Sequence, residues 1–349
     1  MSKNKYQSII DRIRAAHVPD YRSGIFDVDV EHRADGAVVL GGQTTDRAAA
    51  EELIAAVRPQ AGDRLVDEIV RLPDPALGVD VYGLVRAAIA PVYLDPALPA
   101  AQISQLVLGM RLDLLARRGE WLRVRGEDGY LGWVHEGYVR LGEREWAEVW
   151  ERGSSGEPVV SLGAELVDEE GRALARLPWG ARVVRYSGAF ELPDGRRGMV
   201  GSGELVDVDR LADRFPPRGD SVARTARRWH GAPYLWGGVT QSGTDCSGLA
   251  QAVMWMHGVA LPRDSDLQAR VGAEVEPNAD FSGLRAGDLL FFAEETARIS
   301  HVAISLGAGQ IIHSALGNGG VATNDIMGDL DFERRLRKLF VHARRLLPD

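Results

Sequence analysis

The chain of 349 residues contains one cysteine, Cys246, and therefore cannot form a disulfide within itself. It also lacks an apolar run long enough to span a bilayer, and its Lys and Arg residues form no clustered stripe. Its formal net charge is −9. These features argue against a membrane or a nucleic acid as the binding partner.

The first residues of the chain lack the apolar core of a signal peptide, because Ile9-Ile10 is soon followed by Asp11, Arg12 and Arg14. We therefore expect a cytoplasmic protein, although a secreted protein whose leader had been removed would begin in a similar way. One cysteine and scattered histidines offer no closed set of zinc ligands. We expect neither a metal nor an organic cofactor.

The segment around Cys246 predicts the start of a helix. Most single cysteines are small buried apolar residues, so the surroundings must decide whether this one is reactive. The run Leu249–Met256 is almost entirely apolar, and Gly258 is a typical stop signal. Either Thr244 or Asp245 can cap the first turn. Cys246 would then lie where the helix dipole and free amide groups favour a thiolate, so we expect its pKa to be lowered.

His301 and His313 lie on two predicted strands joined by Gly307-Ala308-Gly309. With a three-residue loop, Ala303 lies opposite His313, and the two histidines become diagonal neighbours on one face. A two-residue loop would place them on opposite faces. One imidazole could then take the Cys246 proton while the other fixes its tautomer. Taken singly, each histidine is better explained as a half-buried strand residue with a hydrogen-bond partner.

Six short motifs resemble, in their order and spacing, those of the NlpC-type cell-wall cysteine peptidases. They lie within about residues 223–347 and are Tyr234-Leu235-Trp236-Gly237-Gly238, Thr244-Asp245-Cys246-Ser247-Gly248-Leu249, Leu261-Pro262-Arg263-Asp264-Ser265, Arg285-Ala286-Gly287-Asp288-Leu289-Leu290-Phe291-Phe292, Ser300-His301-Val302-Ala303-Ile304 and Ile312-His313-Ser314-Ala315. The resemblance implies a papain-like α+β fold, with a helix packed on an antiparallel sheet. It also implies hydrolysis of the bond between γ-D-glutamate and a diamino acid in peptidoglycan stem peptides.

The resemblance assigns a role to each matched position. It makes Cys246 the nucleophile, His301 the general base and His313 the group that orients the base. The substrate-binding positions that it implies are Tyr130, Tyr234, Asp245, Ser247 and Ser265.

Two of these implied positions have equally simple structural explanations. In family members that require a free N-terminal L-alanine, the acid before the cysteine pairs with the substrate ammonium, but Asp245 could also be only a helix cap. Tyr130 could be an aromatic residue that completes the core of its own domain. Those members also use a glutamate from an SH3-like domain, whereas residues 100–103 here are Ala-Ala-Gln-Ile and contain no acid.

The chain is long enough for several domains, and we expect four. Residues 1–78 predict a small α+β unit in the order helix, hairpin, helix, strand. Residues 79–143 resemble a bacterial SH3-like barrel through the run Asp128-Gly129-Tyr130-Leu131-Gly132-Trp133-Val134. Residues 144–212 carry the pattern of a second, degenerate barrel, and residues 213–349 form the peptidase domain.

Together, these features predict a cytoplasmic cysteine endopeptidase that cleaves γ-D-glutamyl–diamino acid bonds. Its expected partners are free peptidoglycan-derived peptides, L-Ala-γ-D-Glu-diamino acid, released during wall recycling. One alternative is a secreted autolysin that acts on intact peptidoglycan. Another is a non-catalytic scaffold that binds the wall, against which the set Cys246, His301 and His313 argues.

Overall fold

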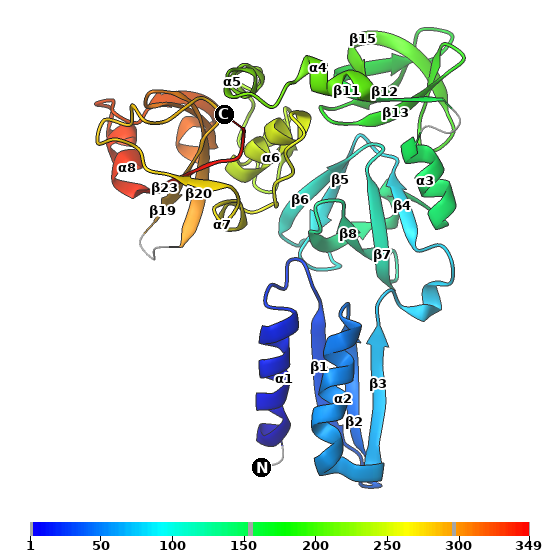
Figure 1. Cartoon of the computed structure of the whole chain (residues 1–349). Helices are drawn as coiled ribbons and strands as arrows, with labels where there is room; N and C mark the ends of the chain where they lie inside the picture. Colours follow the sequence, from blue (N-terminus) through cyan, green and yellow to red (C-terminus); the bar gives the residue numbers. More distant parts are fainter. Residues whose placement is uncertain (1–2, 153–155, 295–297, 349) are drawn as a thin grey trace.

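The computed structural model describes residues 3–152, 156–294 and 298–348. Four main sheets follow one another along the chain, and each has its own side-chain core. The N-terminal sheet and its helices extend away from the other three, which lie together (Figure 1). Among the described residues, no helix combines the length and the apolar character that crossing a membrane requires.

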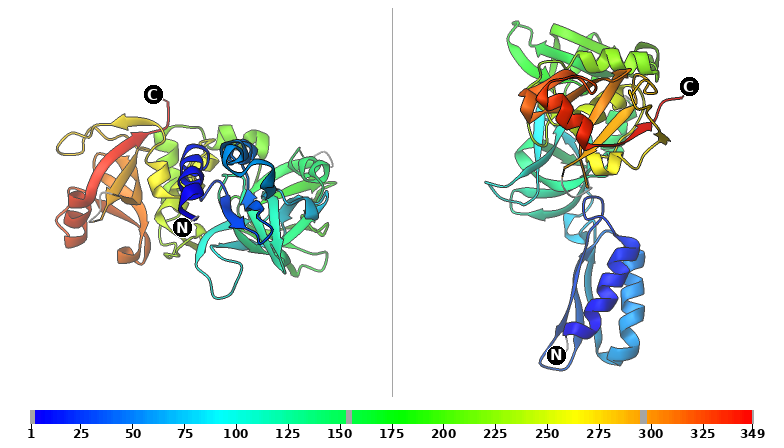
Figure 2. Two further views of the ribbon diagram at one scale, coloured as in Figure 1. Left: turned by 90° about the horizontal axis from the view of Figure 1, so that it is seen from below. Right: turned by 90° about the vertical axis from the view of Figure 1, so that its left-hand side faces the viewer.

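The N-terminal unit has the predicted order of helix, hairpin, helix and strand. Its strands β1 and β2 are antiparallel, whereas β2 and β3 are parallel and are joined through the second helix. Both helices cover one face of this sheet (Figure 2), where apolar residues such as Ile13, Leu40 and Leu53 are fully buried. The elements are α1 (Lys3–His17), β1 (Phe26–His32), β2 (Val38–Thr44), α2 (Arg47–Ala61), η1 (Gly62–Arg64), β3 (Leu65–Arg71) and η2 (Pro75–Leu77).

The next unit, barrel 1, is a seven-stranded sheet in the order β10-β4-β7-β8-β9-β5-β6. Buried and half-buried residues alternate along β8, so that Leu122 and Val124 face the core. Ile25 and Leu72 from the N-terminal unit form a small apolar cluster with Leu115 and Leu131 of barrel 1. The elements are β4 (Tyr82–Val85), β5 (Ile89–Tyr93), β6 (Gln102–Val107), β7 (Arg111–Arg118), β8 (Trp121–Gly126), β9 (Leu131–His135), η3 (Glu136–Tyr138) and β10 (Val139–Gly142).

The third unit, barrel 2, closes on itself because the long strand β11 pairs with both β13 and β15. Its core includes Val107 and Leu108 of barrel 1, while Trp179 belongs to the core of the C-terminal unit. Barrel 1, barrel 2 and the C-terminal unit are therefore packed together through shared apolar clusters. The elements are α3 (Arg144–Arg152), β11 (Glu157–Val167), β12 (Ala173–Leu177), β13 (Arg182–Tyr186), β14 (Ala189–Glu191), β15 (Arg197–Asp207), η4 (Val208–Arg210) and α4 (Leu211–Arg214).

The C-terminal unit packs a helix against an antiparallel sheet, as expected. Helix α6 lies on β20 and β21, and its Leu249 and Val253 share one core with Val302, Ile304 and Ile312. The sheet has the order β18-β23-β19-β20-β21-β22. The elements are α5 (Gly219–Arg227), β16 (Val239–Thr240), β17 (Gly243–Thr244), α6 (Cys246–Met256), α7 (Ser265–Gln268), β18 (Ala273–Val275), β19 (Leu289–Ala293), β20 (Ile299–Gly307), β21 (Gln310–Ala315), η5 (Leu316–Asn318), β22 (Gly320–Asp325), α8 (Asp331–Leu339) and β23 (Phe340–Arg345).

Candidate active site

Cys246 is the first residue of α6, and Asp245 caps this helix. The Asp245 carboxylate accepts a hydrogen bond from the Gly248 amide at 2.7 Å, which satisfies one of the free N–H groups of the first turn. Gly248 has to be small, because a Cβ there would lie 2.1 Å from the Gly238 carbonyl oxygen. The sequence Asp-Cys-Ser-Gly therefore brings the start of the helix close to the preceding loop, with Cys246 at the junction.

The thiol of Cys246 faces strand β20. The residue as a whole keeps partial exposure to solvent, whereas its thiol is buried near the backbone amides of Val302 and Ser247. Burial raises the pKa of the Cys246 thiol to about 12, and the adjacent Asp245 carboxylate adds to this effect. The prediction of a lowered pKa was wrong, because the amides and the nearby Arg263 do not compensate for burial and for Asp245.

His301 and His313 are hydrogen-bonded to each other, with His301 Nε2 2.7 Å from His313 Nδ1. The predicted register is confirmed where Ile304 lies opposite Ile312, which puts both histidines on one face. The predicted three-residue loop, however, is wrong. The connection has two residues, Ala308 and Gly309, both with positive φ, and a register shift between Ser305 and Gly307 adds one residue to β20. The bulge restores the register that a two-residue loop alone would destroy.

Asn324 on β22 extends the line of polar side chains beyond His313. Its Oδ1 lies 3.0 Å from His313 Nε2 and also accepts a hydrogen bond from Asn318 Nδ2 at 2.9 Å. Because Asn324 Oδ1 can only accept, His313 Nε2 carries the proton and His313 Nδ1 accepts from His301 Nε2. This leaves His301 Nδ1 free to accept a proton. Sequence reasoning missed Asn324, which lies outside all six motifs.

Both histidines are neutral at pH 7. Burial, together with the neighbouring His313, lowers the pKa of His301 to about 3. Burial also lowers the pKa of His313 to about 4, against the opposing hydrogen bond with Asn324. The helix that begins at Cys246 packs on β20 and β21, the strands that carry the two histidines. An uncharged thiol and an uncharged pair of imidazoles can carry out acid–base chemistry when the proton moves as the sulfur attacks, as in a hydroxyl nucleophile with its base.

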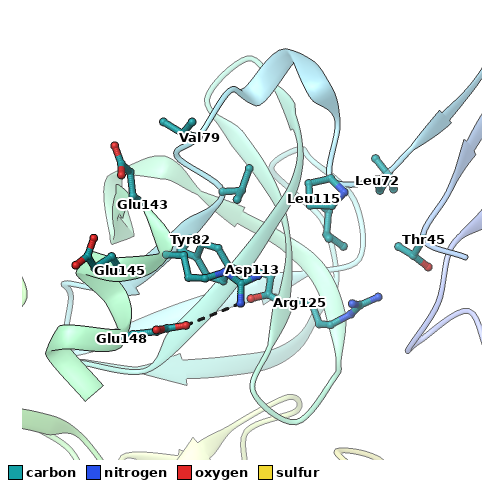
Figure 3. Close-up of a pocket in the computed structure, with 13 residues that line it drawn as sticks. Thr45, Leu72, Val79, Tyr82, Asp113, Leu115, Arg125, Glu143, Glu145 and Glu148 are labelled. Carbon is teal, nitrogen blue, oxygen red and sulfur yellow. Dashed lines mark ion pairs between the residues drawn. The ribbon is translucent and has the colours of Figure 1, made fainter. Parts of the chain in front are cut away.

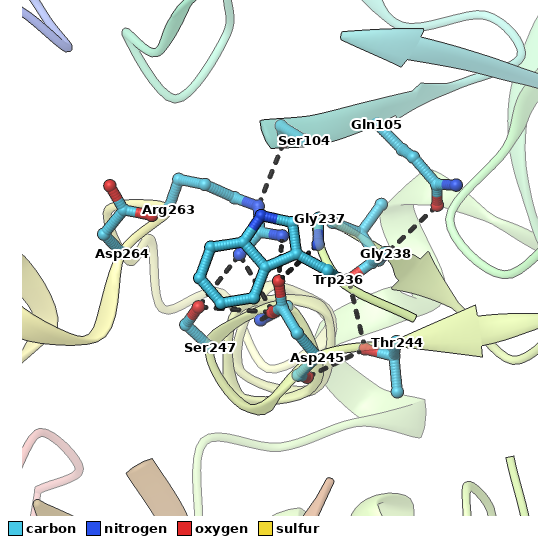
Figure 4. A network of polar contacts seen from close by, with 12 residues as sticks. Ser104, Gln105, Trp236, Gly237, Gly238, Thr244, Asp245, Ser247, Arg263 and Asp264 are labelled. Atoms are coloured by element: carbon cyan, nitrogen blue, oxygen red, sulfur yellow. Dashed lines mark hydrogen bonds and ion pairs between the residues drawn. The ribbon is translucent and has the colours of Figure 1, made fainter. Parts of the chain in front are cut away.

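Asp245 is engaged with an arginine that the sequence analysis did not single out (Figure 4). Arg263 is 1% exposed and donates to both Asp245 carboxylate oxygens, at 3.0 and 2.6 Å. It also donates to the Ser247 hydroxyl at 2.9 Å and to the Ser104 hydroxyl of barrel 1 at 3.0 Å. The Gly237 amide donates to the same carboxylate at 2.9 Å. Asp245 is therefore a cap and half of a buried ion pair.

The remaining predicted substrate positions surround this pair. Tyr234 pairs with Thr244, two residues before Cys246, in an isolated β-bridge, and burial together with Cys246 and Asp245 raises its pKa to about 12. Ser265 is buried at the first turn of α7. Tyr130 reaches over from barrel 1 and donates a hydrogen bond to Asp264 Oδ2 at 3.0 Å. The folded chain thus brings residues from three separate parts of the sequence close to the segment around Arg263.

Barrel 1 also contacts the loop before Cys246 through the stretch without an acid. Gln102 Nε2 donates to the Trp236 carbonyl oxygen at 2.9 Å, and the indole of Trp236 is 66% exposed beside the Asp245–Arg263 pair (Figure 4). The neutral side-chain amide of Gln102 therefore occupies the side of the site that faces barrel 1. The glutamate used by the similar enzymes has no counterpart in residues 100–103.

A hollow of about 600 Å³ between the N-terminal unit, barrel 1 and the start of α3 has a different character (Figure 3). Its lining includes four carboxylates, Asp113, Glu143, Glu145 and Glu148, but neither cysteine nor histidine, and none of the predicted site residues. Within residues 3–152, 156–294 and 298–348, no three His, Cys, Asp or Glu side chains are grouped so that they could hold a metal ion. The chemistry-bearing residues converge at Cys246.

Comparisons with known proteins agree with this location. Residues 231–338 match the NlpC/P60 family, and residues 92–137 match the bacterial dipeptidyl-peptidase Sh3 domain. Two proteins named γ-D-glutamyl-L-lysine dipeptidyl-peptidase, from Bacillus cereus and Bacillus subtilis, are 29% and 27% identical to the chain. Each alignment covers 60% of this chain, and they cover 66% and 71% of the two relatives.

One solved structure supports the architecture. The crystal structure of an NlpC/P60 family protein from Bacillus cereus aligns with a TM-score of 0.62 at 22% identity, over 76% of this chain and 100% of that one. This likeness concerns the fold. With the family matches, it confirms the predicted α+β class with SH3-like β domains before the peptidase domain.

The raised pKa of Cys246 makes a prediction about alkylation of the resting protein. Iodoacetamide should modify Cys246 slowly at neutral pH, and the rate should still rise at about pH 9, above the ordinary thiol pKa of about 8.5. Mass spectrometry of the single labelled site measures this rate, with Cys246→Ser as the unreactive control. A fast rate that is constant between about pH 5 and 8 would instead demonstrate a preformed thiolate–imidazolium pair.

The hydrogen-bond chain predicts that Asn324 controls the rate and the pH profile. Asn324→Leu removes the acceptor that fixes the His313 tautomer, so kcat should fall by about ten- to a hundredfold while KM is unchanged. Asn324→Asp keeps an acceptor and adds a negative charge, which should raise the pKa of His313 and move the acidic limb of kcat to higher pH. Full activity in Asn324→Leu together with an unshifted profile in Asn324→Asp would contradict this role.

Proposed function

We propose that this cysteine peptidase, whose residues 231–338 match the NlpC/P60 family, hydrolyses the γ-D-glutamyl–diamino acid bond of peptidoglycan stem peptides. The observation that carries the proposal is the hydrogen-bonded chain His301, His313 and Asn324, together with Cys246 at the start of α6, the helix that packs on the two strands that bear these histidines. The names of the two Bacillus relatives supply the bond type.

In the proposed reaction, Cys246 Sγ attacks the γ-carbonyl carbon while His301 Nδ1 takes the thiol proton. The C–S bond forms, and the carbonyl oxygen becomes an oxyanion, for which the Tyr234 hydroxyl is the nearby candidate donor. The C–N bond then breaks as His301 returns the proton to the leaving amine. Water, deprotonated at His301, hydrolyses the thioester and releases the thiol and the γ-D-glutamyl product.

The histidine pair suits this sequence of proton transfers. His301 gains a proton when the thiol attacks, and His313 Nδ1 accepts a hydrogen bond from the resulting imidazolium through His301 Nε2. The positive charge therefore exists only while an oxyanion or thiolate lies beside it. Because the site is buried, this transient pair of opposite charges attracts more strongly than it would in water.

We propose that the substrates are free peptides with an N-terminal L-alanine rather than intact peptidoglycan. Support comes from barrel 1, whose Tyr130 and Gln102 contact the peptidase domain beside Asp264 and Trp236, where a peptide N-terminal to the scissile bond would lie. The roles of Ser247 and Ser265 in holding that peptide belong to the same proposal. Wall recycling and a cytoplasmic location remain predictions from the sequence.

The proposed activity is tested with synthetic L-Ala-γ-D-Glu peptides that carry L-lysine or diaminopimelate as the third residue. We expect release of L-Ala-D-Glu, detected by mass spectrometry, and loss of turnover in Cys246→Ser with peptide binding retained by calorimetry. The same protein is incubated with insoluble sacculi. Rapid solubilisation of sacculi would favour the autolysin, and no cleavage of either substrate would reject the proposal.

Asp245 gives a second test, because the ammonium role and the cap role differ in substrate dependence. Asp245→Asn should reduce kcat/KM for free-amine peptides about tenfold more than for N-acetylated peptides, if a charge-assisted bond to the substrate ammonium is lost. Comparing two substrates in one variant cancels any loss of folded protein caused by the unpaired Arg263. Equal losses would leave Asp245 with only its cap and its ion pair.

A further inference from the structure

The loop between α1 and β1, residues 18–25, connects the N-terminal unit to the peptidase domain. Its Arg22 is 242 residues away from Asp264 in sequence, yet Arg22 Nη1 lies 2.8 Å from Asp264 Oδ2 and 2.7 Å from Asp266 Oδ1. Arg22 Nη2 lies 3.0 Å from Asp266 Oδ2 and 2.6 Å from Asp20 Oδ2. One guanidinium thus joins three carboxylates, and its side chain is only 11% exposed.

The loop is also held by its backbone and by apolar packing. The Leu131 amide of barrel 1 donates to the Arg22 carbonyl oxygen at 2.8 Å. Ile25 at the end of the loop is buried with Leu72, Leu115 and Leu131. Arg22 is therefore presented from a fixed backbone position rather than from a freely moving chain, and hydrogen bonds from it hold the pKa of Asp20 below its ordinary value.

The contact of Arg22 with Asp264 reaches a predicted substrate residue. Asp264 Oδ2 accepts both from Arg22 and from the Tyr130 hydroxyl, at 2.8 and 3.0 Å. The Tyr130 proton is therefore committed to Asp264, and only the lone pairs of its oxygen remain for another donor. An N-terminal ammonium of a bound peptide is a donor of that kind. The orientation of Tyr130 depends on Asp264, whose position depends in turn on Arg22.

We infer that Arg22, supplied by the N-terminal unit, is a positioning residue for peptide binding that fixes Asp264 and, through it, the acceptor oxygen of Tyr130. This inference rests on the proposed function. It assigns a role to the N-terminal unit beyond its own packing, because this unit supplies a guanidinium that bridges its own Asp20 to Asp264 and Asp266 of the peptidase domain. The role requires the planar, forked geometry of arginine and not merely a positive charge.

The test is Arg22→Lys, which keeps the charge but cannot bridge three carboxylates with the same geometry. We expect KM for L-Ala-γ-D-Glu-L-lysine to rise about tenfold, the loss of one good hydrogen bond, while kcat stays within about twofold. The matched control is Arg33→Lys. Arg33 belongs to the same unit and makes an exposed ion pair with Glu68 at 2.7 Å. This ion pair lies away from the candidate active site. That variant should leave both constants unchanged.

A double-mutant cycle tests the route through Tyr130. In the Tyr130→Phe background, Arg22→Lys should cause no further rise in KM, because the oxygen that Arg22 positions is already gone. Circular dichroism and the melting temperature verify that each variant is folded. Independent, additive effects of the two substitutions would overturn the route, and an unchanged KM in folded Arg22→Lys would overturn the inference. If the wild type cleaves no peptide, the proposed function fails first and the inference fails with it; an active wild type isolates the role of Arg22.

Discussion

The buried ion pair between Asp245 and Arg263 is the interaction on which the rest of the site depends. Both side chains are almost fully buried, so neither charge can be left without the other. The pair joins four parts of the molecule: the start of α6, the segment before α7, the loop around Gly237 and strand β6 of barrel 1 through Ser104. Cys246 directly follows Asp245, and its position is therefore set by an electrostatic contact that spans two domains.

Electrostatics also explain why the thiol and the imidazoles of the resting site are uncharged. Asp245 carries a negative charge next to the thiol, and burial disfavours both a thiolate and an imidazolium. The sulfur thus becomes a strong nucleophile only when a carbonyl carbon is in place to accept its electrons. A protein with a single cysteine gains from this arrangement, because a neutral thiol is less easily oxidised or alkylated than a thiolate.

Local sequence signals predicted the parts of the site that lie on single elements. The apolar run after Cys246 gave helix α6, and the alternation around the two histidines gave their strands and register. The ionisation of Cys246 was predicted wrongly because a helix terminus is a local feature, whereas burial is a property of the whole fold. Arg263 lies inside a recognised motif but had no assigned role, because its neighbours Pro262 and Asp264 do not reveal that its side chain is buried against Asp245.

Other residues left no local signal at all. Asn324 and Arg22 act through contacts that only the assembled chain creates, Asn324 with His313 on β21 and Arg22 with Asp264 of the peptidase domain. Neither has a sequence pattern that distinguishes it from an ordinary surface polar residue. Their roles follow from hydrogen-bond geometry, which specifies donors and acceptors that a sequence does not specify.

The hairpin that carries the two histidines limits how the length of its strands can change. Side chains alternate along a strand, so the extra residue at the bulge before Gly307 and the two-residue turn act as a matched pair. A one-residue insertion or deletion within either strand, between a histidine and the turn, would move that ring to the opposite face unless a second change in the bulge or the turn compensates for it. The alternation of side chains along this hairpin thus limits which changes in strand length keep the two imidazole rings on one face of the sheet.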